Sequence, residues 1–332
     1  MSPSAPPFVP PTILARRKTS DARLSDLRSE VQSIDELSGA PGLCVYVTGS
    51  YGRREASEHS DLDLFFLHEG TRQEAGLTAI RETLVQADLV RINRRLGFPE
   101  FSGDGRYLQS HGLTEIEAHL GGPSDDYANL FTARLLMLLE SQSVHNADVF
   151  DRAYRGVVEL YFRDYKGHEE AFQPFFLVND VLRFWKTLCL NYEHRRNRGD
   201  EGEAAKNKSR LKNLKLRFSR LNTCFSGVVP LIAPGAEGTV DDVVARLRPT
   251  PNERLSAIAV EVPEVRGTVA RLLEFYAWFL EQTGRAEEDV LGWIADEDAR
   301  TEAFEKARAY GDTYFDLLRA LSDDDTLRYL VV

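Results

Sequence analysis

The sequence predicts a module of the α/β or α+β class, followed by a long helical region. Two runs rich in apolar residues, Leu43–Val47 and Asp61–Leu67, have the length and composition of strands, and helical patterns flank them. From Ser124 onward, apolar residues recur at helical spacing for the rest of the chain. We therefore expect a sheet-containing domain over residues 18–123 and an all-α helical domain over residues 124–332.

An arm and a helix are expected before the first strand. Residues 1–17 are rich in Pro, Ser and Ala, which is typical of an extended or disordered arm. Ser20 is then available to cap a helix whose apolar residues recur at helical spacing and which should stop before Gly39. The first strand, Leu43–Val47, is apolar throughout, so we expect it to be central and covered on both faces.

The second strand should lead through a turn into another helix. Thr71 and Glu74 have the spacing of a capping box, which predicts that the helix begins there. A glycine-rich stretch follows, in which Glu100–Leu108 can form a third strand and Glu115–Leu120 a short helix. These elements complete the expected sheet-containing domain.

Composition excludes some classes of protein. With 41 basic and 52 acidic residues, the chain is a poor candidate for a protein whose whole surface follows a nucleic-acid backbone. The N-terminus lacks the pattern of a secretory signal, and no apolar run is long enough to span a bilayer. The three cysteines are far apart and have no metal-ligand spacing, which indicates a reducing compartment. We expect a cytoplasmic protein without a membrane partner.

Two aspartates at the start of the second strand are the first candidates for chemistry. Asp61 and Asp63 are two apart, so their carboxylates should share one face of the strand while Leu62 and Leu64 take the other. Carboxylates held side by side repel, and a hard divalent cation such as Mg²⁺ between them removes the repulsion. Two aspartates with this spacing are also common at ordinary turns, so the pair gains weight only from its sequence context.

That context is the Gly49-Ser50 pair, which closes the first strand. Glycine lets the backbone approach a phosphate, and the serine hydroxyl and free N–H groups can donate to it. A short helix over Tyr51–Glu55 would begin there and favour negative charge. Together with two carboxylates for a metal ion, the pattern favours phosphoryl or nucleotidyl transfer.

The stretch GSYGRREASEHSDLDLFF, from Gly49 to Phe66, resembles the signature of the DNA polymerase β-like nucleotidyltransferase superfamily. Within it, the stretch is similar to the N-terminal domain of protein-PII uridylyltransferases and their DUF294-type relatives. The resemblance implies a small mixed sheet, and hence the α+β class, with an NTP bound together with Mg²⁺ or Mn²⁺. It also implies transfer of a nucleoside monophosphate with release of pyrophosphate.

The resemblance assigns roles to residues of this chain. Gly49 and Ser50 would bind the triphosphate, and Asp61 and Asp63 would hold the metal ions. Arg53 and Arg54 match basic positions that can contact phosphate, although exposed arginines are as often simply solvated.

A third carboxylate completes the metal site in that superfamily. Asp104 and Glu100 are the candidates, and we favour Asp104 because its glycine neighbours would let it reach the cleft. An aspartate between glycines is also common in an ordinary turn.

Basic residues concentrate between Arg195 and Arg220. Lys208 and Lys212 fall on one face of a predicted helix, opposite Leu211 and Leu214. A solvated amphipathic helix explains this pattern, since long basic side chains commonly line exposed faces. The functional alternative is a wall of the cleft that contacts the triphosphate or an anionic acceptor.

The leading hypothesis is therefore an enzyme that moves NMP from an NTP to a hydroxyl of a protein or small molecule. Modification of tRNA or synthesis of a cyclic dinucleotide is an alternative for the acceptor, with RNA possible but not favoured. A different class is a non-catalytic NTP-binding module, which the lack of a third carboxylate near the metals would favour.

Overall fold

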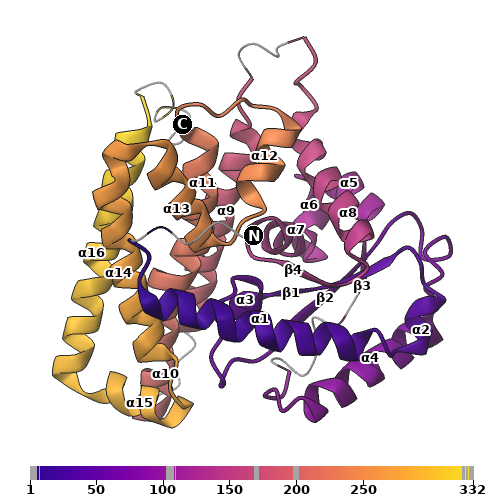
Figure 1. The fold of residues 1–332 in the computed structure, drawn as a ribbon, viewed down its shortest axis with the longest axis horizontal. Helices are drawn as coiled ribbons and strands as arrows, with labels where there is room; N and C mark the ends of the chain where they lie inside the picture. The colour runs from indigo at the N-terminus through magenta and orange to yellow at the C-terminus, as the bar shows by residue number, and fades with distance from the viewer. Residues whose placement is uncertain are drawn as a thin grey trace. The chain divides into compact units, whose positions relative to one another are not determined.

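The computed structural model describes residues 6, 8–101, 108, 110–167, 172–196, 202–323, 326 and 328. The chain forms two compact units (Figure 1). The sheet unit comprises Ala15–Glu170, and the helical unit comprises Met1–Leu14 with Ala171–Val332. The predicted α+β class is confirmed, with a mixed sheet followed by a largely helical region.

Four strands make up the sheet, in the order β3-β2-β1-β4. Their bounds are β1 Leu43–Thr48, β2 Asp63–His68, β3 Ser110–Gly112 and β4 Gln142–His145. The central strand β1 is antiparallel to both β2 and β4, whereas β2 and β3 are parallel, so the sheet is mixed. All residues of β1 are buried, as its unbroken apolar run predicts.

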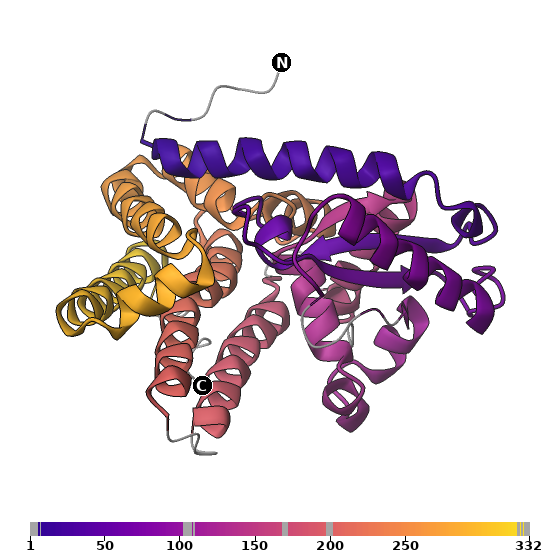
Figure 2. The same cartoon turned by 90° about the horizontal axis from the view of Figure 1, so that it is seen from below.

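Helices cover both faces of this sheet (Figure 2). Val45 and Val47 of β1 pack in one cluster with residues of α1 and α4, such as Leu27 and Leu89. On the opposite face, the Tyr46 ring lies 5.5 Å from that of Phe150 in α8. The helical segments of the unit are α1 Pro11–Val31, α2 Asp35–Ser38, α3 Gly49–Gly52, α4 Ala79–Arg95, α5 Leu113–His119, α6 Pro123–Tyr127, α7 Leu130–Leu139, α8 Ala147–Glu159 and η2 Leu160–Phe162.

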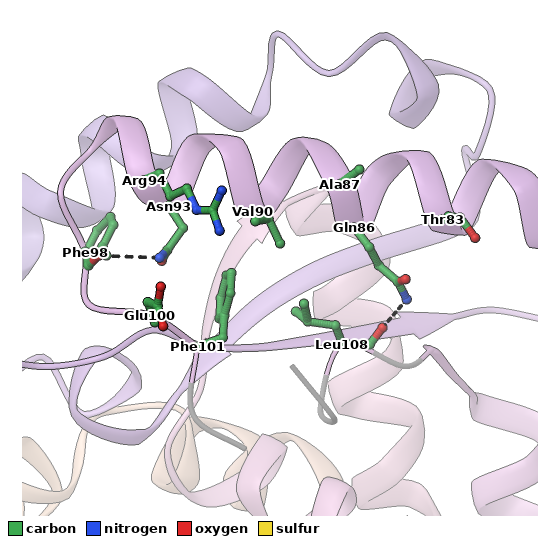
Figure 3. A pocket seen from close by; sticks show the side chains of 10 residues that line it. All are labelled: Thr83, Gln86, Ala87, Val90, Asn93, Arg94, Phe98, Glu100, Phe101 and Leu108. Carbon is green, nitrogen blue, oxygen red and sulfur yellow. Dashed lines mark hydrogen bonds between the residues drawn. The ribbon is translucent and has the colours of Figure 1, made fainter. Parts of the chain in front are cut away.

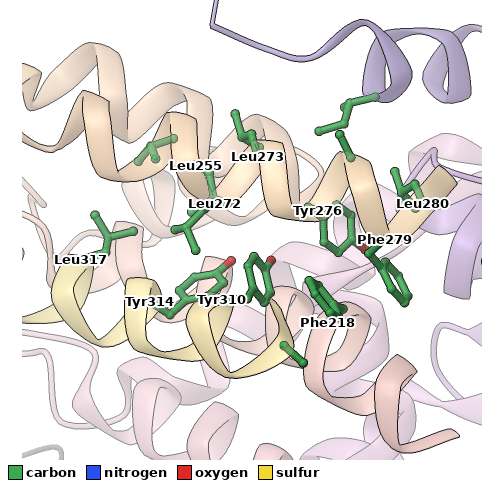
Figure 4. Packing of buried hydrophobic residues seen from close by; sticks show 14 of the residues in the cluster. Phe218, Leu255, Leu272, Leu273, Tyr276, Phe279, Leu280, Tyr310, Tyr314 and Leu317 are labelled. Atoms are coloured by element: carbon green, nitrogen blue, oxygen red, sulfur yellow. The ribbon is translucent and has the colours of Figure 1, made fainter. Parts of the chain in front are cut away.

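The helical unit has its own core, in which aromatic rings meet (Figure 4). Phe218 stacks on Phe279 at 4.9 Å and on Tyr310 at 4.8 Å between ring centroids. Its segments are α9 Phe175–Arg196, α10 Glu203–Lys215, η3 Leu216–Arg220, α11 Leu221–Ile232, α12 Val240–Leu247, α13 Pro251–Glu261, η4 Pro263–Val265, α14 Arg266–Thr283, α15 Glu287–Ala295 and α16 Glu297–Leu321. None of the described helices combines the length and apolarity that crossing a bilayer requires.

The start of the first helix differs from the sequence prediction. Helix α1 begins at Pro11, so residues 11–17 are helical rather than part of an extended arm. Proline suits the first turn of a helix, where its missing N–H has no intrahelical partner to lose. Ser20 consequently lies within α1, and its Oγ accepts a hydrogen bond from the Ala56 N–H at 2.9 Å instead of capping the helix.

The predicted capping box forms but does not start a helix. Glu74 accepts a hydrogen bond from the Thr71 N–H at 2.8 Å, and the Thr71 hydroxyl accepts one from the Glu74 N–H at 3.3 Å. A turn ends at Gly76, whose φ is +70°, and α4 begins only after its own cap, Thr78. The box therefore stabilises a turn.

Two strand predictions also need correction. Glu100 and Phe101 are outside any strand, and residues 102–107 of the expected third strand lie outside the described residues. The strand that pairs with β2 is Ser110–Gly112. In addition, β4 interrupts a region that we expected to be purely helical, because Gln142–His145 pairs with the second edge of β1.

Candidate nucleotide and metal site

The turn after β1 lies against the start of β2. Strand β1 ends at Thr48, which is in register with Asp63, and α3 begins at Gly49. The φ of Gly49 is +65°, a conformation that glycine adopts without a Cβ penalty. A Cβ at this position would lie 2.5 Å from Asp63 Oδ2. The turn needs glycine for its backbone angle and for its close approach to a carboxylate.

Asp61 and Asp63 follow the expected alternation. Leu62 and Leu64 are each 1% exposed and belong to the core cluster, whereas both aspartates are half-buried. Asp63 opens β2, and Asp61 precedes it by two positions. The structure thus brings Gly49 and Asp63 together, and Ser50, Asp61 and Asp63 are all half-buried.

This arrangement fits a divalent cation. Carboxylate oxygens are the ligands that Mg²⁺ prefers, and Asp61 and Asp63 supply two such groups beside the turn. Among the described residues, however, no group of three or more potential metal ligands gathers. The favoured third carboxylate, Asp104, lies outside the described residues.

The alternative acid, Glu100, is exposed and lines a cavity of about 540 Å³ along α4 (Figure 3). Asn93 Nδ2 donates a hydrogen bond to the Pro99 carbonyl at 2.8 Å, and Gln86 Nε2 donates one to the carbonyl of Leu108. These two bonds attach Pro99 and Leu108 to α4. The assignment of the third carboxylate stays a prediction for both Asp104 and Glu100.

Residues 24–117 match the family model of a nucleotidyltransferase domain. The matched range contains Gly49, Ser50, Asp61 and Asp63, and the structure places Asp63 against Gly49. A search of curated proteins found no match to the chain. The comparison therefore supports the nucleotidyltransferase domain in general and names no acceptor.

Arg53 of this domain has partners other than those we expected. It is 7% exposed, its Nε donates to Glu55 Oε1 at 2.6 Å, and its Nη1 donates to Glu140 Oε2 at 2.5 Å. The sequence suggested a phosphate contact for this guanidinium. The structure pairs it with two buried carboxylates behind the turn, and a contact with phosphate stays a prediction.

Glu140 is the residue that the sequence analysis missed. It directly follows α7, and its carboxylate is fully buried. The signal was available, since a glutamate at the end of the apolar run Leu135–Leu139 requires a partner if it is buried. The identity of that partner could not be read from spacing, because Arg53 is 87 positions away.

Arg54 follows α3 in a left-handed conformation. Its φ is +58°, and the Glu55 N–H donates to the Ser50 carbonyl at 2.9 Å, which is the closing bond of a Schellman motif. Glycine usually occupies this position. Arg54 instead pairs through two nitrogens with Asp21 of α1, which fastens the turn to that helix.

Further contacts join α1 to the same loop. Arg23 lies 4.0 Å from the centroid of the Phe98 ring, and that ring packs edge-on against Tyr51 at 5.3 Å between centroids. Burial raises the pKa of Tyr51, so its hydroxyl stays protonated at neutral pH. The first helix is therefore part of the support for the turn.

Substitutions at Arg54 should separate backbone strain from the ion pair. Arg54→Ala loses the Asp21 contact and keeps the unfavourable φ, whereas Arg54→Gly loses the contact but relieves the φ. We expect Arg54→Gly to be more stable than Arg54→Ala by about 1 kcal/mol in urea unfolding. An alanine variant as stable as the glycine variant would contradict this explanation.

Lys208 and Lys212 lie on α10 of the helical unit. Both are exposed, opposite the buried Leu211 and Leu214, as the helical pattern predicts. Lys208 Nζ lies 3.6 Å from Glu287 Oε1. Their contact with a nucleotide stays a prediction.

Proposed function

We propose that this protein is a metal-dependent nucleotidyltransferase that moves NMP from an NTP to a hydroxyl group and releases pyrophosphate. The observation that carries the proposal is the contact between the Gly49 turn and Asp63, inside the range that matches a nucleotidyltransferase domain. The turn and the paired carboxylates occupy the same end of β1 and β2, where a triphosphate and a cation would both be needed.

Roles follow from the chemistry of these groups. Asp61 and Asp63 would hold Mg²⁺ or Mn²⁺, which when bound neutralises phosphate charge and lowers the pKa of a coordinated hydroxyl. The Ser50 hydroxyl and the backbone of the turn would orient the triphosphate for in-line attack. Asp104 is our candidate for the third acid. The four-residue helix α3 is too short for its macrodipole to contribute much.

For the acceptor we favour a protein or small molecule. The similarity of Gly49–Phe66 to uridylyltransferases supports a protein hydroxyl, and the net charge of −11 opposes extensive RNA binding. RNA is the second candidate, supported by the exposed Lys208 and Lys212 on α10. RNA retention that falls steeply with salt would favour it.

The experiment is a transfer assay with α-labelled NTPs. The protein is incubated with Mg²⁺ and each NTP in turn, with and without cell extract, and the label is sought in protein, RNA and small molecules. We expect one NTP to label one class of acceptor. Identical labelling by wild type and the Asp61→Ala/Asp63→Ala variant for every NTP would refute the proposal.

A further inference from the structure

The segment that follows α7 forms the back of the Gly49–Gly52 turn. Glu140 Oε1 accepts a hydrogen bond from the Gly49 N–H at 3.3 Å, and Glu140 Oε2 accepts one from Arg53. The Glu140 carbonyl oxygen is so close to Gly52 that a Cβ there would lie 1.9 Å from it. One residue outside the matched range 24–117 thus contacts both ends of the turn.

This contact is built from buried charges. The Glu140 side chain is fully buried, and the Arg53 side chain is 7% exposed. Arg53 also pairs with Glu55, which is buried as well. Charges of alternating sign therefore lie behind the turn, from Glu55 through Arg53 to Glu140. Each is opposed by a neighbour, as a buried ion requires.

Stability alone does not explain such a pair. Apolar residues of similar volume usually fill a buried site at least as favourably, because they avoid the desolvation of two ions. Hydrogen bonds differ from apolar packing in having direction. The Glu140 carboxylate fixes the orientation of the Gly49 N–H and, through Arg53, the position of the residues that follow Gly52.

We propose that Glu140 is a positioning residue for the triphosphate-binding turn. With Arg53, it holds Gly49 and Ser50 in the geometry that accepts the triphosphate, and it touches no substrate itself. The inference rests on the proposed function, since it assumes that this turn binds an NTP. It also extends the candidate functional site beyond residues 24–117 to Glu140, which lies between α7 and β4.

The test compares two buried carboxylates in the same unit. Glu140→Gln removes the charge behind the turn, whereas Asp125→Asn removes the charge of a fully buried pair in which Arg134 also donates to the Tyr161 hydroxyl. Both variants should lose thermal stability, by up to roughly 10 °C, because each removes a buried carboxylate that pairs with a buried arginine. Binding of each NTP with Mg²⁺ is measured by calorimetry well below both melting temperatures.

We expect Glu140→Gln to raise the Kd for the bound NTP about 10- to 100-fold, and Asp125→Asn to leave it near the wild-type value. Equal Kd values for the two variants would overturn the positioning role. If Glu140→Gln does not fold, Arg53→Lys serves instead, because it keeps the charge but cannot reach both carboxylates. With that variant, an unchanged Kd would overturn the inference. A wild-type protein that binds no NTP would refute the proposed function itself.

Discussion

Replacing Asp61 or Asp63 with asparagine should lower nucleotidyl transfer on the order of 10³-fold while leaving the fold intact. Asparagine keeps the size of the side chain but removes the charge that would hold a divalent cation. Both side chains are half-buried next to the turn, whereas their neighbours Leu62 and Leu64 form the core, so stability should change little. The rates are measured with α-labelled NTP at saturating Mg²⁺.

Glu69 provides a matched control for this prediction. It follows β2 and pairs on the surface with Arg152 at 2.9 Å, so Glu69→Gln removes a carboxylate of the same unit away from the turn. We expect its transfer rate to stay within about two-fold of wild type, because surface ion pairs contribute little. An equal loss of activity in Glu69→Gln and Asp63→Asn would show that net charge, and not the site, controls the rate.

Within the turn, Gly52→Ala should destabilise the protein more than any other substitution that adds one methyl group. A Cβ at position 52 would lie 1.9 Å from the Glu140 carbonyl oxygen and 3.0 Å from that of Val47. Both obstacles are backbone atoms, so a side-chain movement cannot relieve the overlap. We expect a loss of about 3 kcal/mol in the free energy of unfolding, together with loss of NTP binding.

A glycine in another helix gives the opposite expectation. Gly292 lies exposed in α15, and nothing lies within 4 Å of a Cβ built there. Gly292→Ala should therefore stabilise by up to about 1 kcal/mol, because alanine has the higher helix propensity. Urea unfolding of both variants measures the difference. A Gly52→Ala protein as stable as wild type would mean that Glu140 does not press against the turn.

The central part of the site could be predicted because its signals are local. The apolar run of β1, the Gly49-Ser50 turn and the alternation around Asp63 each depend on neighbouring residues. Once two such strands pair in antiparallel fashion, the end of one meets the start of the other, as Thr48 and Asp63 do. The position of Asp63 beside the turn follows from this pairing.

The supporting parts could not be predicted because their partners are distant in sequence. Nothing near Glu140 in the sequence indicates its partners, because its contacts with Gly49 and Arg53 span 91 and 87 residues. Composition indicated an arm up to residue 17, yet packing and ion pairs with the loop hold α1 in place. Tertiary contacts override local propensity in such segments.

Local signals can also be correct and still mislead. Thr71 and Glu74 form the expected capping bonds, but the chain reaches a positive φ at Gly76 before a helix can propagate. Strand β4 was missed because Gln142–His145 is short and mostly polar, so it lacks the apolar alternation of a strand. Only its pairing with β1 identifies this segment as a strand.

The most direct test of nucleotidyl transfer follows both ends of the triphosphate in one reaction. Wild-type protein is incubated with Mg²⁺, the preferred NTP and its acceptor, with label at the α-phosphate in one sample and at the γ-phosphate in another. We expect the α-label on the acceptor and the γ-label in pyrophosphate, in equal amounts. Label from the γ-phosphate on the acceptor, or its release as free phosphate without α-labelling, would contradict the assignment of this site.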